Sequence, residues 1–118
     1  EFLIAGRNPT PEFRAARQAR TLATGQIFGT PECPLTPLNP EWDQNFMRQM
    51  LEGRLSEVDD FDIEDISRQA GRSTHEIRTW IAAFAALAAN GPYRGRQDYY
   101  RPINEWIAGY GMLSAEPA

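Results

Sequence analysis

The chain has 118 residues, 42% of them hydrophobic, and its 12 Lys and Arg against 16 Asp and Glu give a formal net charge of -4. This length suffices for one modest core, and the acidic balance disfavours general binding to nucleic acid. The longest apolar stretch, residues 81–89, is far shorter than the roughly 20 residues that cross a bilayer, and a single cysteine forms no internal disulfide. We therefore expect a cytoplasmic protein that binds neither membranes nor nucleic acid.

Four segments carry the signals of α-helices. Thr10-Pro11-Glu12 and Asn39-Pro40-Glu41 each place a capping side chain before a proline and an acid, as at a helix start, and Asp62 can cap a further, short helix. Apolar residues then recur three and four positions apart, and glycines mark the ends. The predicted helices span residues 10–22 (ending before Gly25), 40–52, 62–70 and 73–90. The fourth should be the most buried, because it carries a wide apolar stripe formed by Ile77, Trp80, Ile81, Phe84 and Leu87.

The remaining segments complete a predicted division of the chain. Residues 24–40 form a Pro-rich connector, 41–90 a helical core, and 91–118 a loop and a terminal strand. Within the core, Ile63, Ile66 and Ala70 should point inward from their short helix. Residues 91–96 are predicted to be a loop, and the short strand falls within residues 103–112, where Gly109 and Gly111 disfavour a helix. The fold class is thus mostly α, with about four helices and one short strand.

The candidate for chemistry is Glu76, within the run of residues 73–80. It falls in the first turn of the predicted buried helix, where free amides and the helix dipole favour a charged carboxylate, a ligand suited to a hard divalent metal. Ser73 and Glu76 equally have the spacing of a capping box, which is the commoner use of such a pair. His75, beside them, is more typical of a structural or solvent-facing residue than of a ligand. Spacing alone leaves these alternatives open.

A resemblance to a known family bears on the choice. From residue 37 to residue 115 the chain resembles the C-terminal third of the 2,3-dihydroxyphenylpropionate 1,2-dioxygenases, which belong to the class III extradiol ring-cleavage family. The segment before Thr30 resembles it only weakly. The motifs that match in order and spacing are Pro37-Leu38-Asn39-Pro40, Trp42-Asp43, Ser73-Thr74-His75-Glu76-Ile77, Thr79-Trp80, Ala82-Ala83-Phe84-Ala85-Ala86, Tyr99-Tyr100-Arg101-Pro102-Ile103 and Glu105-Trp106-Ile107-Ala108-Gly109.

The resemblance implies an α/β extradiol dioxygenase, of which residues 1–118 are the C-terminal segment of one catalytic domain. It implies Fe(II) held by the carboxylate of Glu76 and by two histidines from the N-terminal half, with a further histidine as acid and base. The substrates would be O2 and catechols bearing a propionate or cinnamate side chain, and the ring would open outside the diol. Tyr99, Tyr100 and Arg101 are candidates for substrate binding, since arginine suits a carboxylate and tyrosine a phenolic oxygen. Core and surface packing are the commoner explanation of such a short aromatic and basic run.

The chain departs from the family in one large respect. It has a single histidine, His75, next to the predicted ligand and at neither family position. The residues before the tyrosine pair, 92–98, also differ from the family in length and sequence. We therefore predict that this chain alone is inactive and that the N-terminal part of the same enzyme, or a companion chain, supplies the histidines in a homo-oligomer. The start at Glu1 and the lack of targeting features in residues 1–8 favour a piece of a longer protein. The alternative is a free-standing helical interaction module or accessory subunit without catalytic activity.

Overall fold

The computed structural model describes residues 10–118, so the predictions for residues 1–8 lie outside the described part. In this part the predicted four helices are confirmed, and a two-stranded antiparallel hairpin follows them. The helices are α1 Pro11–Ile27, α2 Pro40–Leu51, α3 Ile63–Ala70 and α4 Arg78–Ala88, and the strands are β1 Tyr93–Ile103 and β2 Ala108–Pro117. Three short 3-10 turns connect them: η1 Leu55–Asp60, η2 Arg72–Ile77 and η3 Asn104–Trp106. No helix among residues 10–118 is both long and apolar enough to cross a membrane.

The predicted caps begin three of the four helices. The side chains of Thr10, Asn39 and Asp62 each accept a hydrogen bond from the backbone N–H three residues later, at 3.2, 3.1 and 2.8 Å. Gly53 and Gly71 follow α2 and α3 with positive φ angles of 70° and 87°, a backbone conformation that glycine adopts without strain. Local sequence signals therefore position α2 and α3 as predicted.

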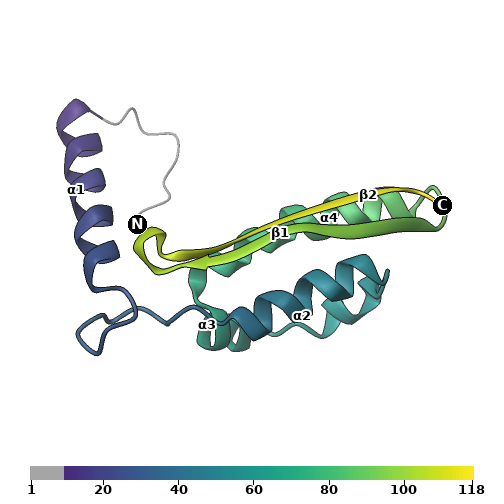
Figure 1. The fold of residues 1–118 in the computed structure, drawn as a ribbon, viewed down its shortest axis with the longest axis horizontal. Coiled ribbons are helices and arrows are strands. Elements are labelled where there is room, and N and C mark those ends of the chain that lie inside the picture. The colour runs from purple at the N-terminus through teal and green to yellow at the C-terminus, as the bar shows by residue number, and fades with distance from the viewer. Residues whose placement is uncertain (1–9) are drawn as a thin grey trace.

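The end of α1 was predicted wrongly. The helix continues through Gly25 to Ile27, and a Cβ atom at Gly25 would overlap the backbone carbonyl oxygen of Glu105. Glycine at this position allows α1 to lie directly against η3, rather than ending the helix. In Figure 1, α1 otherwise stands apart from the rest of the chain.

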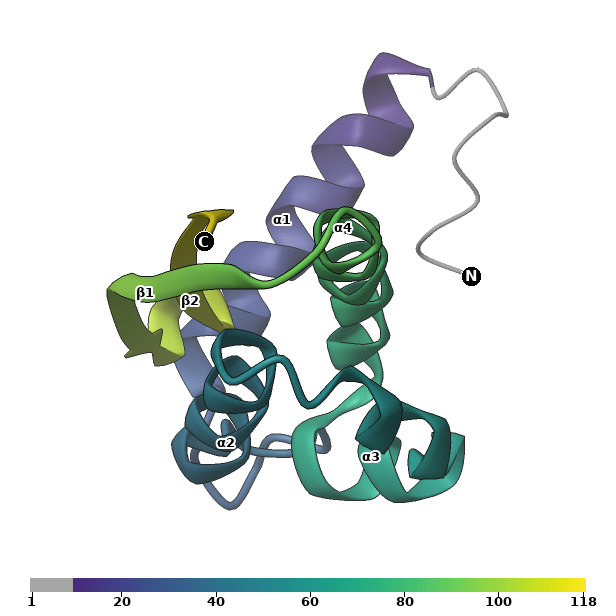
Figure 2. The same cartoon turned by 90° about the vertical axis from the view of Figure 1, so that its right-hand side faces the viewer.

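The hydrophobic core forms where α2, α4 and the start of β1 meet. Phe46, Met50 and Phe84 are its buried members, and Met50 is fully inaccessible to solvent. The Phe84 and Tyr93 rings lie 5.5 Å apart, and the Tyr93 hydroxyl donates to the Met50 carbonyl oxygen. Figure 2 shows α2 and α4 as separate columns with β1 reaching across from the end of α4.

The most buried element is α2, contrary to the prediction for residues 73–90. Only Phe84 of α4 is buried, and α4 begins at Arg78 because residues 72–77 form the tighter η2 turn. The stripe through Trp80 and Ile81 is half-buried in the chain's own core, whereas the opposite face of α4, made of alanines, is exposed. In α3, Ile66 is buried and Ala70 half-buried as predicted, but Ile63 is 54% exposed. The described chain therefore covers one side of these helices only.

The C-terminal region contains two long strands, where a loop and one short strand were predicted. Residues 93–96 belong to β1, which pairs with β2 along almost its whole length and has one irregularity between Gln97 and Tyr99. The predicted terminal strand corresponds to β2. Most side chains of β1 are exposed, so the alternation of apolar and polar residues that identifies a strand is absent.

Glycines in β2 let the hairpin approach α2 closely. A Cβ atom at Gly111 would lie 2.7 Å from Met47 Sδ, and one at Gly109 would overlap Asp43 Oδ2. In both places the neighbour is a side chain of α2. Gly109 and Gly111 thus allow a strand to pack closely on a helix. Both lie in a strand, which agrees with the prediction that residues 103–112 do not form a helix.

Candidate functional site

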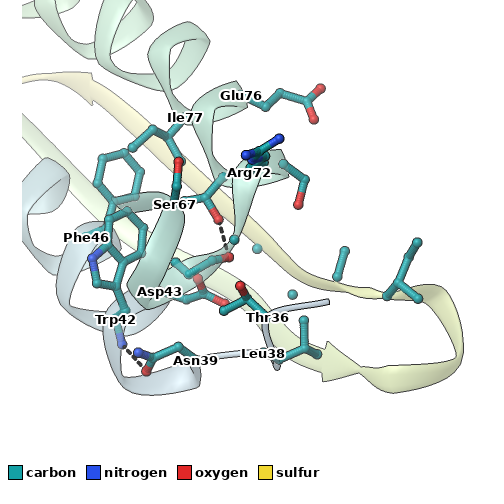
Figure 3. A pocket seen from close by; sticks show the side chains of 18 of the residues that line it. Thr36, Leu38, Asn39, Trp42, Asp43, Phe46, Ser67, Arg72, Glu76 and Ile77 are labelled. Atoms are coloured by element: carbon teal, nitrogen blue, oxygen red, sulfur yellow. Dashed lines mark hydrogen bonds between the residues drawn. The ribbon is translucent and has the colours of Figure 1, made fainter. Parts of the chain in front are cut away.

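A cavity of about 670 Å³ lies between the connector before α2, α2 itself, the α3–η2 corner and the hairpin. One wall is apolar and comes largely from α2, with Trp42, Phe46 and Met47, to which Ile77 and Trp80 add their side chains. Figure 3 shows Trp42 and Phe46 side by side on this wall, and their rings stack with centroids 5.8 Å apart and planes 9° apart. The apolar part of a ligand would find its contacts on this wall.

A half-buried polar pair interrupts the apolar wall. The Tyr100 hydroxyl, from β1, donates a hydrogen bond of 2.7 Å to Asp43 Oδ2, in the first turn of α2. Burial raises the pKa of Asp43, and the hydrogen bond from Tyr100 opposes that rise. Burial is also the main reason that the pKa of Tyr100 is raised, followed by its contact with Asp43. At neutral pH Tyr100 is therefore a hydrogen-bond donor, and its proton is committed to Asp43.

Glu76 lines the same cavity from the η2 turn. Its side chain is exposed, and Figure 3 shows it near Arg72 of the same turn, away from Trp42 and Phe46. The structure does not form the capping box, because neither η2 nor α4 has a side-chain cap. Glu76 also lies before α4, not in the first turn of a buried helix as predicted. The Glu76 carboxylate therefore does not make the capping hydrogen bond that a capping box would require.

The three predicted substrate-binding residues do not share one face of the strand. Successive side chains of a strand point to opposite faces, and only Tyr100 of the three lines the cavity. Tyr99 is 42% exposed, with Met112 opposite it, and Arg101 is exposed, with Tyr110 opposite it. The structure therefore brings Tyr100 and Glu76 to one cavity and leaves the other two outside.

Sequence reasoning missed Asp43 and Arg72 as cavity residues. Asp43 was interpreted only as part of a family motif. The signal that it approaches the hairpin is Gly109 on β2, which leaves room for its carboxylate. Arg72 directly follows the helix-ending Gly71. A residue after such a corner can point into a cavity, but the direction depends on which elements surround the corner.

His75 has a structural partner. Its Nε2 atom lies 2.9 Å from the Ser67 Oγ, on α3, and the ring does not line the cavity. This contact fits the interpretation of His75 as a structural or solvent-facing residue. Across residues 10–118 no three His, Cys, Asp or Glu side chains gather as a possible metal site. Glu76 offers one oxygen donor at the cavity, so a metal there would need ligands from beyond the described residues.

Comparison with known proteins decides the family. Residues 10–111 match the model of the catalytic LigB subunit of aromatic ring-opening dioxygenases. This chain belongs to the LigB family. The match begins at residue 10, so it includes the segment before Thr30, which the sequence motifs linked to the family only weakly. The four-helix arrangement with a C-terminal hairpin is accordingly a fragment of the LigB fold.

Three relatives of this LigB chain are each called a 2,3-dihydroxyphenylpropionate/2,3-dihydroxicinnamic acid 1,2-dioxygenase. The protein of Dechloromonas aromatica is 79% identical over 97% of this chain and 36% of its own length. Those of Azotobacter vinelandii and Xanthobacter autotrophicus are 74% and 69% identical, over 98% and 99% of this chain and 37% and 38% of their own lengths. The chain spans only about a third of the curated relatives it matches.

Proposed function

We propose that this chain is the C-terminal, mostly helical part of an extradiol dioxygenase that opens 2,3-dihydroxyphenylpropionate-type catechols with O2. The identity of 79% to the relative from Dechloromonas aromatica carries this proposal. The cavity supports it, since apolar and aromatic side chains form one of its walls, a surface that suits an aromatic ring. The remaining two thirds of such an enzyme would complete the site.

Glu76 is the proposed carboxylate ligand of Fe(II). It lines the cavity, it is exposed rather than buried in the chain's own core, and no cap engages it. Two histidine ligands and the acid/base histidine would come from the N-terminal part of the enzyme, because this chain has one histidine and that residue contacts Ser67. By itself the chain is expected neither to hold iron nor to cleave catechol.

The test uses a completed enzyme, in which this chain replaces the matching third of the Dechloromonas aromatica relative. Glu76→Ala should lower bound iron from near one per chain to less than about a tenth, with a parallel loss of turnover, since three protein ligands are needed to hold such a metal. Because Glu76 makes no cap, the free energy of unfolding of the iron-free protein should change by no more than about 0.5 kcal/mol, whereas the iron-loaded parent gains stability from its metal. Iron is measured by metal analysis of the purified variant.

Glu116→Ala is the matched control, because Glu116 is an exposed carboxylate on β2 outside the cavity. It should retain iron and turnover. Normal iron content in Glu76→Ala would refute the ligand assignment. A folded completed enzyme that takes up no iron and cleaves no catechol would refute the proposed function and favour the alternative, an interaction module without activity.

A further inference from the structure

Arg72 is the one basic residue among the described residues that line the cavity. The acidic side chains there are Asp43 and Glu76, and the rest of the lining is neutral. Asp43 is engaged by Tyr100, and Glu76 is the proposed metal ligand. Any anionic group of a ligand bound in this cavity would therefore find Arg72 as its cationic partner among residues 10–118.

The guanidinium of Arg72 is not committed to a partner in the described chain. Arg54, Arg68 and Arg96 each form an ion pair with a neighbouring carboxylate, whereas Arg72 forms none with residues 10–118. Its side chain is exposed, so its charge remains hydrated until a ligand arrives. Glu76, four residues further along η2, is not within ion-pair distance of Arg72.

The spacing of Arg72 and Glu76 suits a ligand with two polar ends. A 3-10 turn rises about 2 Å per residue, so residues four apart are displaced by about 8 Å along its axis. A catechol whose diol faces a metal at Glu76 would carry its ring past the wall of Trp42, Phe46 and Trp80. Arg72 lies beside Glu76 on the same turn (Figure 3), so a carboxylate on the ring's side chain would meet the guanidinium if that side chain extends along the turn rather than along the apolar wall.

We propose that Arg72 binds the side-chain carboxylate of the substrate and thereby sets the preference for catechols that carry one. The proposal rests on the proposed function and gives to Arg72 the role predicted for Arg101, which lies outside the cavity. A guanidinium binds a carboxylate through two parallel hydrogen bonds, a geometry that the ammonium of lysine does not reproduce. Arg72 is a specificity residue in this proposal and takes no part in opening the ring.

The test compares two substrates of the completed enzyme that differ in one group. 2,3-Dihydroxyphenylpropionate carries the carboxylate, and 3-propylcatechol has the same ring and chain length without it. Arg72→Gln should raise KM for the first about 10- to 100-fold with little change in kcat, the size expected for losing a charge-assisted pair. For 3-propylcatechol, KM and kcat should stay within about twofold of the parent. Arg72→Lys should lose less than Arg72→Gln, because it keeps the charge without the paired hydrogen bonds.

Arg78→Gln is the matched control, because Arg78 is exposed at the start of α4 and does not line the cavity. It should leave both substrates unaffected. The assignment is overturned if Arg72→Gln changes KM for both substrates by the same factor, or for neither, while the parent turns over both. If the parent is folded but cleaves neither substrate, the proposed function itself is refuted. The iron content of the same sample is an independent test of that function.

Discussion

α1 and α2 begin with the same sequence signal but differ in how far they are buried. Each has a capping residue, a proline and a glutamate at its start, and each meets the hairpin region through a glycine. Yet α2 buries four residues, Phe46, Met47, Gln49 and Met50, whereas α1 buries none. The capping residues at the start thus determine where a helix begins. Whether burial stabilises the helix depends on which other elements pack against it.

The contacts of the two helices differ in kind as well as in extent. α2 is bound to the hairpin by side chains that are distant in sequence: Tyr93 donates to the Met50 carbonyl and Tyr100 to Asp43. α1 lies against η3 through Gly25, and its apolar Leu22 is 63% exposed. The α2–hairpin unit should therefore carry the stability of this chain, with α1 contributing little.

The largest expected effect is at the centre of the α2–hairpin unit. Met50→Ala removes a side chain that is fully inaccessible to solvent and leaves a cavity, so it should lower the free energy of unfolding by about 2–5 kcal/mol. Leu22→Ala, the control on α1, should change it by no more than about 0.5 kcal/mol. Urea denaturation of the two variants measures the contrast. Equal losses would show that α1 is as firmly packed as α2.

A smaller effect is expected where glycine permits close approach. Gly109→Ala places a Cβ atom against Asp43 and Tyr100, and the overpacking should lower the free energy of unfolding by about 1–3 kcal/mol.

Gly25→Ala should push α1 away from the Glu105 carbonyl oxygen, but alanine should also stabilise the helical conformation of α1 by up to about 1 kcal/mol. Global stability of Gly25→Ala should then change little, while the amide signals of residues 104–106 shift in NMR spectra. A loss as large as that of Gly109→Ala would show that the α1–η3 contact supports the core.

The same contrast explains how far sequence reasoning reached. Thr10, Asn39 and Asp62 were predicted as caps, and they cap, because a cap depends on a backbone N–H only three residues away. Predictions that depended on tertiary neighbours fared differently. Gly25 was assigned as a helix end when its small size serves contact with η3, and β1 was missed because its side chains are mostly exposed.

The candidate site divides in the same way. The motif match identified Glu76, and the structure places it in a cavity, although its role as a ligand stays a prediction. Tyr99, Tyr100 and Arg101 were grouped by adjacency in sequence, but strand geometry points only Tyr100 into the cavity. The position of Arg72 at the cavity and the hydrogen bond between Asp43 and Tyr100 could not be predicted. Both depend on how η2 and the hairpin pack against α2, and Asp43 and Tyr100 are 57 positions apart in the sequence.

The smallest of the predicted effects concerns this pair and has a characteristic pH dependence. Because burial raises the pKa of Asp43 above its ordinary value of 3.8, the folded chain binds this proton more tightly than the unfolded chain does. The contribution of Asp43 to stability therefore falls as pH rises from about 3.8 through its folded pKa. Tyr100→Phe removes the hydrogen bond that opposes the rise, so the pKa of Asp43 should increase further and the fall should extend to higher pH.

At neutral pH the loss in Tyr100→Phe should be about 1–2 kcal/mol, since a partly buried carboxylate loses a donor. As the pH falls through the folded pKa of Asp43 and the carboxyl becomes protonated, the loss should shrink. Tyr110→Phe is the control, because Tyr110 is 41% exposed and lies across the hairpin from Arg101, outside the cavity. Its stability should follow the parent at every pH. If the urea midpoints of the two variants ran parallel across the pH range tested, the hydrogen bond between Asp43 and Tyr100 would not be what joins α2 to the hairpin. The hydrogen bond from Tyr93 to the Met50 carbonyl oxygen would then have to hold the hairpin on α2.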